Sequence, residues 1–181
     1  MSSPSADVSV RVAWAEDAAA IADLQVRTWP ELYADLVPAQ HLPHSAADLA
    51  EVWHQALSKP TDARNRVLLA LERNRVVGFA LTCPAGDPDC DPITDGELAE
   101  ITIDPAERGR GHGSRLLQAG VDTLVADHFT RAVSWVNSRD DALRTFLTQA
   151  GWAADGAHRE VAIDEAGSSR MKLVRLHTRI G

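Results

Sequence analysis

The residues best suited to chemistry lie in one short stretch, Arg108–Ser114, which reads RGRGHGS. Its glycines, Gly109, Gly111 and Gly113, allow the backbone to turn sharply and to approach a ligand closely. From residue 114 onward the pattern is helical, and the first turn of a helix offers free N–H groups and the positive end of the helix dipole. With two arginines alongside, the stretch predicts a site for a phosphate or pyrophosphate. The plainer interpretation is a Gly-rich turn that closes a strand–helix unit.

The spacing of these glycines excludes two common phosphate-binding motifs. A P-loop requires Gly-Lys-Ser or Gly-Lys-Thr after its glycines, and the sequence contains neither triplet. The dinucleotide fingerprint requires G-x-G-x-x-G, whereas the spacing here is G-x-G-x-G. The elements around the stretch must therefore decide what it binds.

Hydrophobic periodicity predicts a mixed α/β sheet with helices on both faces. Strands are expected at 8–12, 67–72, 76–82, 97–103, 132–136, 160–163 and 171–178. Helices are expected at 16–29, 45–57, 114–127 and 140–150. Pro30 is expected to interrupt the first helix, and Ser45 is a candidate N-cap of the second. We expect one domain over 8–181, preceded by a disordered N-terminus, residues 1–7.

The composition is that of an ordinary soluble globular protein, with 45% hydrophobic and 24% charged residues among 181. The first ten residues, MSSPSADVSV, lack the basic region and apolar core of a signal peptide, and no apolar run is long enough to span a bilayer. A cytoplasmic location is therefore expected. Cys83 and Cys90 are expected to be free thiols, and no metal site is predicted.

The net charge of −8 is unevenly distributed. The segment 85–107 contains eight acidic residues and neither lysine nor arginine, which argues against nucleic acid as a partner. An acidic rim of this kind could attract a cationic small molecule. Solvation of a surface loop is the simpler explanation for most of these charges.

Two blocks of the sequence match a family pattern. The first is Glu97–Pro105 (ELAEITIDP) followed by Arg108–Gly113, against E-L-x-x-L-x-V-x-P and Gln/Arg-x-x-Gly-x-Gly/Ala. The second is Trp135-Val136, Asp140 and the run 146–152 (FLTQAGW), against a strand, an Asn and F-Y-x-x-x-G-F. The chain thus resembles the GNAT superfamily of acetyl-CoA-dependent N-acetyltransferases from Val8 to about Thr178. The resemblance implies a mostly antiparallel, twisted sheet of about seven strands, splayed between strands 97–103 and 132–136.

The resemblance also implies where acetyl-CoA, the co-substrate, would lie. The split between the two strands would hold it, with the pantetheine arm paired to the backbone of Ile101 and Ile103. A backbone N–H near Ile101–Thr102 could stabilise the oxyanion of the tetrahedral intermediate. The implied cofactor-binding residues are Ile101, Thr102, Ile103, Arg108, Gly109, Arg110, Gly111, His112, Gly113, Ser114, Asp140 and Phe146.

The implied reaction is direct attack by a primary amine on the thioester in a ternary complex. Glu97 is the first candidate for the general base, acting through water, and Glu100 is the second. Strand alternation predicts that they lie on opposite faces, unless a bulge re-aims one. Trp29 and Tyr33 lie in the link that borders the acceptor site in the family, and they are candidate substrate contacts; otherwise they pack that link against the sheet.

Two positions depart from the family pattern. The usual tyrosine, which protonates the leaving thiolate, falls at Leu147, and the usual asparagine falls at Asp140. Ser138, Tyr33, His112 or water could replace the tyrosine, or the thiolate could leave unassisted. The departures also suggest an alternative, a catalytically silent acyl-CoA-binding or sensory domain. The sequence leaves open whether the acceptor amine is a small molecule or a protein, and whether the chain is a monomer or a homodimer.

Overall fold

The computed structural model describes residues 7–181, so the expected disordered N-terminus, residues 1–7, lies outside the described residues apart from Asp7. The Asp7 carbonyl accepts a hydrogen bond from the Arg73 N–H. No helix in the described part of the chain is long and apolar enough to cross a membrane. The strands are β1 (Val8–Val12), β2 (Arg66–Glu72), β3 (Arg75–Pro84), β4 (Asp95–Ile103), β5 (Arg131–Asn137), β6 (Ala153–Ala162) and β7 (Arg170–Arg179). The α-helices are α1 (Ala18–Leu32), α2 (Ala46–Ser58), α3 (His112–Ala126) and α4 (Asp141–Gln149).

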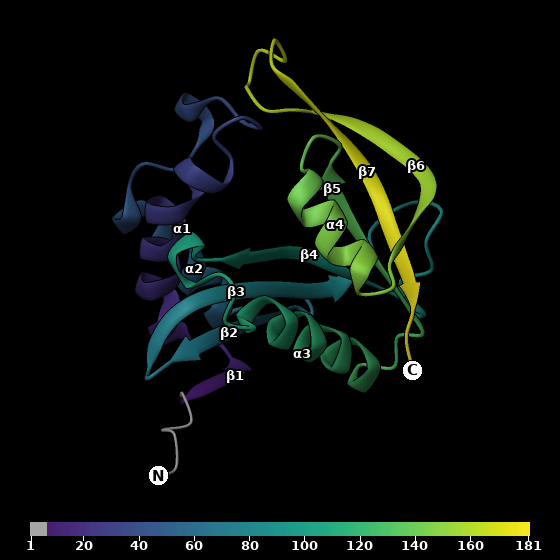
Figure 1. Cartoon of the computed structure of the whole chain (residues 1–181), viewed down its shortest axis with the longest axis horizontal. Coiled ribbons are helices and arrows are strands. Elements are labelled where there is room, and N and C mark those ends of the chain that lie inside the picture. The colour runs from purple at the N-terminus through teal and green to yellow at the C-terminus, as the bar shows by residue number, and fades with distance from the viewer. Residues whose placement is uncertain (1–6) are drawn as a thin grey trace.

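The strands form one seven-stranded sheet in the order β1-β2-β3-β4-β5-β7-β6. Neighbouring strands are antiparallel except for β4 and β5, which are parallel. The β4–β5 pairing covers Asp95–Glu97 against Arg131–Val133, and beyond it the two strands diverge (Figure 1). The predicted mixed, mostly antiparallel sheet and its split between these strands are confirmed.

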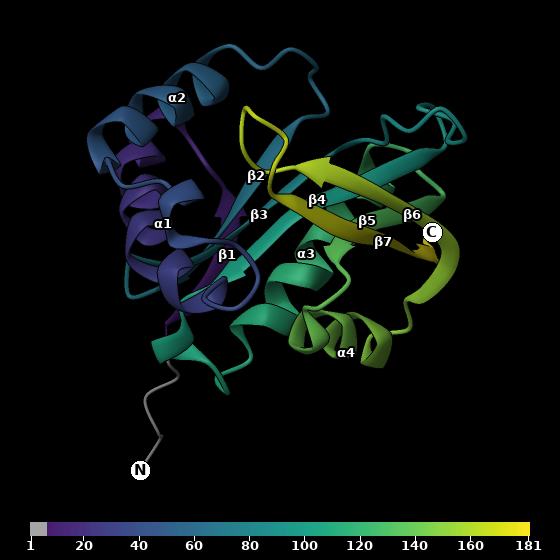
Figure 2. The same ribbon diagram turned by 90° about the horizontal axis from the view of Figure 1, so that it is seen from above.

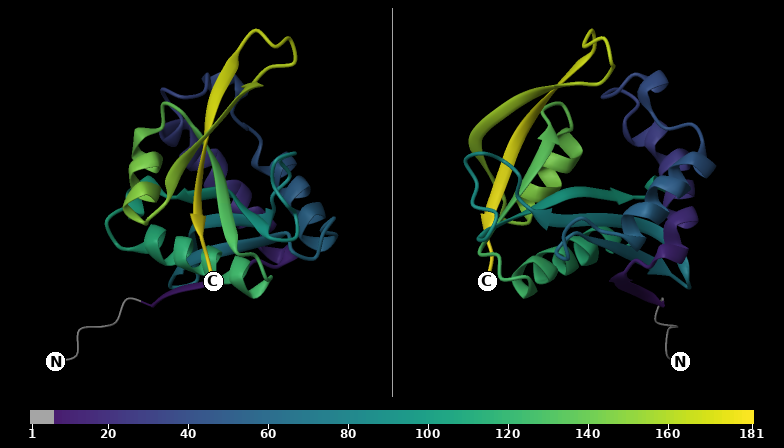
Figure 3. Two further views of the ribbon diagram at one scale, coloured as in Figure 1. Left: turned by 90° about the vertical axis from the view of Figure 1, so that its right-hand side faces the viewer. Right: turned by 180° about the vertical axis from the view of Figure 1, so that it is seen from behind.

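Helices cover both faces of the sheet, as predicted (Figure 2). Alternation along β2 shows how the two faces are filled. Leu69 packs in a cluster with Ile21 and Leu24 of α1, whereas Leu68 packs in a second cluster with Leu116 of α3. Helix α4 covers the β5–β7 part of the sheet, and the tip of the β6–β7 hairpin projects away from α3 (Figure 3). The split in the sheet is therefore bordered by α1, α3 and α4.

Two predicted boundaries were wrong by more than two residues. Pro30 does not interrupt the first helix, because α1 continues to Leu32. A proline removes one hydrogen bond, and here it lies in the last turn, where little helix remains to be disrupted. The Tyr33 N–H still bonds to the Trp29 carbonyl at 2.9 Å. Strand β6 begins at Ala153 rather than at residue 160, because its exposed polar residues and a register shift hide the alternation.

A β-bulge in β4 decides where the two candidate glutamates point. Leu81 of β3 faces Glu100 and Thr82 faces Leu98, so Ala99 is an extra residue. Glu97 faces Cys83, and Cys83 lies on the same side of β3 as Leu81, which packs against the α1-side cluster. Glu97 and Glu100 therefore lie on the same face, and the prediction from simple alternation was wrong.

Candidate active site

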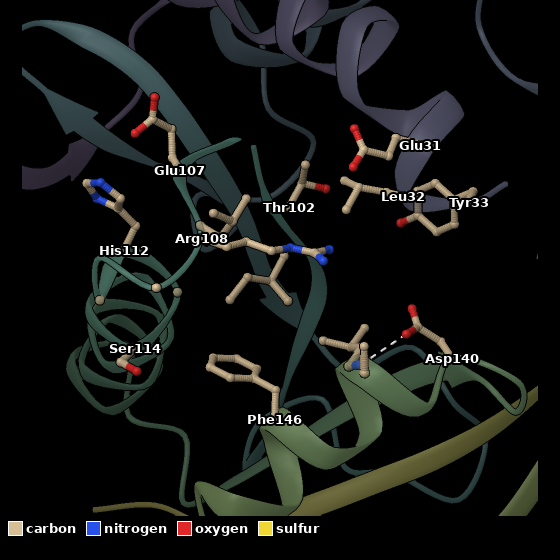
Figure 4. A pocket seen from close by; sticks show the side chains of 17 residues that line it. Glu31, Leu32, Tyr33, Thr102, Glu107, Arg108, His112, Ser114, Asp140 and Phe146 are labelled. Carbon is tan, nitrogen blue, oxygen red and sulfur yellow. Dashed lines mark hydrogen bonds between the residues drawn. The ribbon is translucent and has the colours of Figure 1, made fainter. Parts of the chain in front are cut away.

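A cleft of about 620 Å³ opens where β4 separates from β5 (Figure 4). The end of α1, the second half of β4, the loop into α3, the first turn of α3 and the start of α4 surround it. Its lining residues are Glu31, Leu32, Tyr33, Ile101, Thr102, Ile103, Glu107, Arg108, Gly109, Gly111, His112, Gly113, Ser114, Asp140, Ala142, Leu143 and Phe146. The cleft thus brings together every predicted cofactor-binding residue except Arg110.

The Gly-rich stretch forms one end of this cleft. Gly109 and Gly111 have φ angles of 75° and 81°, in the left-handed region that favours glycine. Gly111 is the N-cap of α3, so the helix begins at His112, two residues earlier than predicted, and Gly113 is already helical. The first N–H groups of α3 lack partners within the helix, so they are available to an anion in the cleft.

The two arginines of the stretch point in different directions. The Arg108 side chain extends across the cleft (Figure 4). Arg110 instead pairs behind the loop, with its Nη1 3.2 Å from Glu72 Oε1 and 3.0 Å from Glu107 Oε2. The buried His112 ring lies in the same cluster, with Nε2 3.2 Å from Glu72 Oε2. The side chains of Arg110 and His112 therefore brace the loop rather than enter the cleft.

This bracing cluster also brings together groups that could bind a metal. Ligand atoms of Glu72, Glu107 and His112 lie within 4.8 Å of one another. Both carboxylates are already engaged by arginines, Glu72 by Arg110 and Glu107 by Arg75 and Arg110. Because these guanidinium groups balance the carboxylate charge, the arrangement favours an ion-pair network over a metal centre.

The other end of the cleft holds a chain of hydrogen bonds that converges on one oxygen of Glu100. The Thr102 hydroxyl donates to Glu100 Oε1 at 2.8 Å, and the Tyr33 hydroxyl approaches the same oxygen at 3.3 Å. The Trp29 indole N–H donates to Thr102 Oγ1 at 3.2 Å. The Tyr33 ring packs edge-on against Trp29, with ring centroids 5.4 Å apart. Trp29 and Glu100 thus lie just behind the cleft wall that Tyr33 and Thr102 form.

Burial raises the pKa of Glu100, and hydrogen bonds from Thr102, Tyr33 and the Ile101 backbone partly oppose this. The Asp140 charge raises the Glu100 pKa further. Burial also raises the pKa of Tyr33, and the negative charge of Glu100 adds to the effect. A neutral tyrosine therefore donates to a carboxyl group whose pKa is raised, the direction that suits a general base.

Glu97 lies outside the cleft, on the far side of the bulge. Burial and Asp87 raise the Glu97 pKa, while Arg159 lowers it. Its cross-strand neighbour Cys83 is a free thiol, as is Cys90, which confirms the prediction for both cysteines. Burial, followed by the charge of Glu97, raises the pKa of Cys83 to about 12. Neither candidate base lines the cleft, but Glu100 contacts two side chains that do, Tyr33 and Thr102.

The acidic loop before β4 is bound by arginines rather than open to a cationic ligand. Arg175 is 5% exposed and contacts three carboxylates, Asp89 and Asp155 at 2.6 Å and Asp87 at 3.3 Å. Arg131 of β5 reaches Asp155 of β6 at 3.0 Å, across β7, and Asp95 at the start of β4 at 3.3 Å. These partners come from β5–β7, so sequence reasoning missed them.

Helix α4 shows what the two departures from the family pattern do. Asp140 Oδ1 accepts the Leu143 N–H at 3.0 Å, so it caps the helix and also lines the cleft. Leu147 is fully buried in the core, and Phe146 is the neighbour that faces the cleft. Among the side chains considered as replacements for the tyrosine, Tyr33 lines the cleft, whereas Ser138 lies outside its lining and the His112 ring is bound to Glu72.

Sequence reasoning also missed five residues that line the cleft. These are Glu31, Leu32, Glu107, Ala142 and Leu143. All five lie within three positions of a predicted site residue: Glu31 and Leu32 precede Tyr33, Glu107 precedes Arg108, and Ala142 and Leu143 follow Asp140. Adjacency to a predicted residue was the available signal for them.

Comparison with known proteins agrees with the fold. The acetyltransferase (GNAT) family matches residues 20–152, more than half of the chain. The protein therefore belongs to this family.

Particular relatives show how far the likeness extends. Mycothiol acetyltransferase of Nocardiopsis dassonvillei is 33% identical over 134 residues, which cover 71% of this chain and 36% of that protein. The chain thus spans about a third of the length of this curated relative. A GNAT acetyltransferase from Streptococcus pneumoniae superposes with a TM-score of 0.69 and 18% identity, over 97% of this chain and 100% of its own. YncA from Salmonella typhimurium, solved with its cofactor acetyl-CoA, has a TM-score of 0.69 and 17% identity, over 96% of this chain and 94% of its own. These two structures share the fold of the chain.

Proposed function

We propose that the protein transfers the acetyl group of acetyl-CoA to a primary amine, by direct attack within a ternary complex. The observation that carries the proposal is one cleft with two chemically different ends. The start of α3 and Arg108 offer an anion site at one end, and Tyr33 with Glu100 offers a proton acceptor at the other. Between them runs the part of β4 beyond its pairing with β5.

The cofactor would span this cleft. Its pyrophosphate would bind the first N–H groups of α3 and the Arg108 guanidinium, which together supply hydrogen bonds and positive charge. Its pantetheine arm would lie along Ile101–Ile103, where β4 has left β5 and its backbone groups can accept an added strand. The thioester would then lie near Thr102, between the two ends of the cleft.

Proton transfer would use Tyr33 and Glu100. As the amine nitrogen bonds to the acetyl carbon, its proton passes to the Tyr33 oxygen and the Tyr33 proton passes to Glu100 Oε1. The C–S bond then breaks and coenzyme A leaves as a thiolate, which is a good leaving group near neutral pH. Leu147 is buried in the core and would take no part in the reaction.

The first test measures binding and turnover separately. Acetyl-CoA should raise the melting temperature of the protein, and a panel of small-molecule and peptide amines should release free coenzyme A with at least one acceptor. Arg108→Ala should weaken acetyl-CoA binding about tenfold, the effect of one charge-assisted contact. Lys59→Ala, which removes an exposed cation at the end of α2, is the matched control and should bind as the wild type does.

Three outcomes separate the alternatives. No thermal shift with acetyl-CoA would contradict the cofactor site. Tight binding with no turnover on any amine would favour the silent acyl-CoA-binding domain, for which the buried Leu147 is the structural argument. Turnover on peptides rather than small amines would identify a protein acceptor.

A further inference from the structure

The hydrogen bonds around Glu100 have a direction that the chemistry of their donors fixes. An indole N–H can donate but cannot accept, so Thr102 Oγ1 is the acceptor in its 3.2 Å contact with Trp29. The single hydroxyl proton of Thr102 is then free to point to Glu100 Oε1, 2.8 Å away. The chain therefore runs from Trp29 through Thr102 to Glu100.

The same tryptophan also acts on the second donor to that oxygen. Trp29 and Tyr33 are one helical turn apart, and their rings meet edge-to-face at an interplanar angle of 82°. This packing holds the Tyr33 ring where its hydroxyl lies 3.3 Å from Glu100 Oε1. Both donors to Glu100 Oε1 are thus set by Trp29, although Trp29 itself lies outside the cleft lining.

We propose that Trp29 is a positioning residue that keeps Glu100 Oε1 an unprotonated hydrogen-bond acceptor, through the Thr102 hydroxyl and by holding the Tyr33 ring. In its consequence for acetyl transfer, the proposal rests on the proposed function. It assigns Thr102, which is 2% exposed, a role through its side chain as well as its backbone. In this role Trp29 acts through Thr102 and Tyr33 and does not contact the acceptor.

The charged and polar groups around Glu100 make its pKa sensitive to the loss of a hydrogen bond. Tyr33 from the end of α1 and Asp140 from the start of α4 face Glu100, and Glu31 and Arg108 line the same cleft. Burial and Asp140 raise the pKa of Glu100, and the hydrogen bonds oppose them. Loss of either donor should therefore raise the Glu100 pKa further. Glu100 would then be ionised, and able to accept a proton, only at a higher pH.

The experiment follows the Glu100 carboxyl directly by carbon-13 NMR titration, with the resonance assigned from Glu100→Gln. Thr102→Val keeps the shape but removes the hydroxyl, and it should raise the Glu100 pKa by about one pH unit. Trp29→Phe keeps a ring against Tyr33 but removes the N–H, and it should cause a smaller rise. Thr102→Ser restores the hydroxyl and should titrate as the wild type does. The double variant should titrate as Thr102→Val alone, because Trp29 then has no hydroxyl to orient.

The outcomes separate this proposal from the proposed function. An unchanged Glu100 titration in folded Thr102→Val and Trp29→Phe, or a double variant whose rise is the sum of the two, would overturn the positioning role of Trp29. If the titration moves as expected but no variant or wild type acetylates any amine, the proposed function fails and the hydrogen-bond chain stands. If acetylation occurs, its acidic limb should move with the titration.

A measurement on the wild-type protein tests the proposal even if the variants do not fold. The indole N–H resonance of Trp29, assigned from its contacts with Tyr33, should shift with pH in step with the Glu100 carboxyl. An indole resonance that ignores the Glu100 titration would overturn the proposal.

Discussion

The two ends of β4 place similar carboxylates in opposite circumstances. At the first end β4 pairs with β5, and the acidic loop before it is held by Arg175 and Arg159. At the second end β4 leaves β5 and borders the cleft, where Glu100 receives hydrogen bonds from uncharged hydroxyl groups. Within residues 7–181, Glu100 forms no ion pair. Acidic residues thus form ion pairs at one end, whereas at the other end Glu100, the proposed base, is bound by hydroxyl groups.

The difference follows from the partner that each carboxylate receives. A guanidinium stabilises the ionised carboxylate strongly, so the group stays charged and its geometry is fixed. A hydroxyl stabilises it less, so burial dominates and the pKa of Glu100 rises. The comparison predicts that substitutions at the first end affect mainly folding, whereas those at the second end affect mainly catalysis.

The largest effect is expected at the cleft end. Glu100→Gln retains the shape and an oxygen that accepts hydrogen bonds from Thr102 and Tyr33, but it cannot take a proton. The rate of coenzyme A release with a competent amine should fall by about 100- to 10,000-fold. Glu97→Gln, on the same strand and the same face, should lower the rate little. Equal losses in the two variants would show that the bulge does not separate their roles.

At the arginine-bound end the expected effect is on stability. Arg175→Ala would take one of two arginine partners from each of Asp87 and Asp155, which keep Arg159 and Arg131, and it should lower the free energy of unfolding by about 2 kcal/mol. Arg170→Ala, on the same strand, removes an exposed pair with Glu160 and should cost less than about 1 kcal/mol. Urea unfolding measures both. Similar losses would mean that burial of the Arg175 network contributes little.

The pH dependence should also differ between the ends. The folded state raises the Glu100 pKa above its unfolded value, so ionisation of Glu100 costs stability. The contribution of Glu100 to stability is therefore full below the unfolded pKa and is lost as the pH rises through the folded pKa. Activity should change in the opposite direction and increase through the same pH range, because the base must be ionised. Chemical unfolding and initial rates across the acidic range, with Glu100→Gln as the reference, would reveal the opposed trends.

The Asp155 carboxyl should behave in the opposite way. Burial acts against ionisation, but the Ala157 N–H and Arg175 outweigh it and lower the Asp155 pKa. Its stabilising contribution is present above the unfolded pKa and is lost as the pH falls through the folded value. Asp155→Asn should therefore reduce the loss of stability on acidification. If acid unfolding is the same in this variant, the ion-pair network does not control it.

What the sequence could predict depended on how local each feature is. The Gly-rich turn is local, because two glycines, an arginine and a helix start lie within seven residues, and these residues line the cleft. That the turn binds an anion stays a prediction. The face of β4 on which Glu97 and Glu100 lie could not be predicted from the local sequence. It depends on the bulge at Ala99, which appears only when β4 is paired with β3. The neutralisation of the acidic loop depends on Arg175, which lies more than 80 residues away along the chain. The different directions of the Arg108 and Arg110 side chains also depend on a distant residue. Glu72 of β2 pairs with Arg110 behind the loop.

The smallest effects should come from the glycines of the anion site, where backbone geometry rather than charge does the positioning. Gly109→Ala would meet no atom within 4 Å, so its cost should be the left-handed backbone alone, about 1 kcal/mol of unfolding free energy. Gly111→Ala has the same kind of backbone and would also meet Arg115 Nη1 at 3.2 Å, so it should cost somewhat more. Gly113→Ala is helical and would contact Phe146 at 3.5 Å, an ordinary distance, so it should be neutral or slightly stabilising.

These three variants test whether the cleft end is held by its backbone. Urea unfolding without cofactor should give costs in the order Gly111→Ala, Gly109→Ala, Gly113→Ala, with the last near zero or of opposite sign. Acetyl-CoA affinity should fall most for Gly111→Ala, because the N-cap sets the direction of the first N–H groups of α3. If Gly113→Ala were the most destabilising of the three, the turn would depend on close packing against Phe146 rather than on left-handed backbone. The cleft end would then be built by side-chain packing, as the opposite end is by ion pairs.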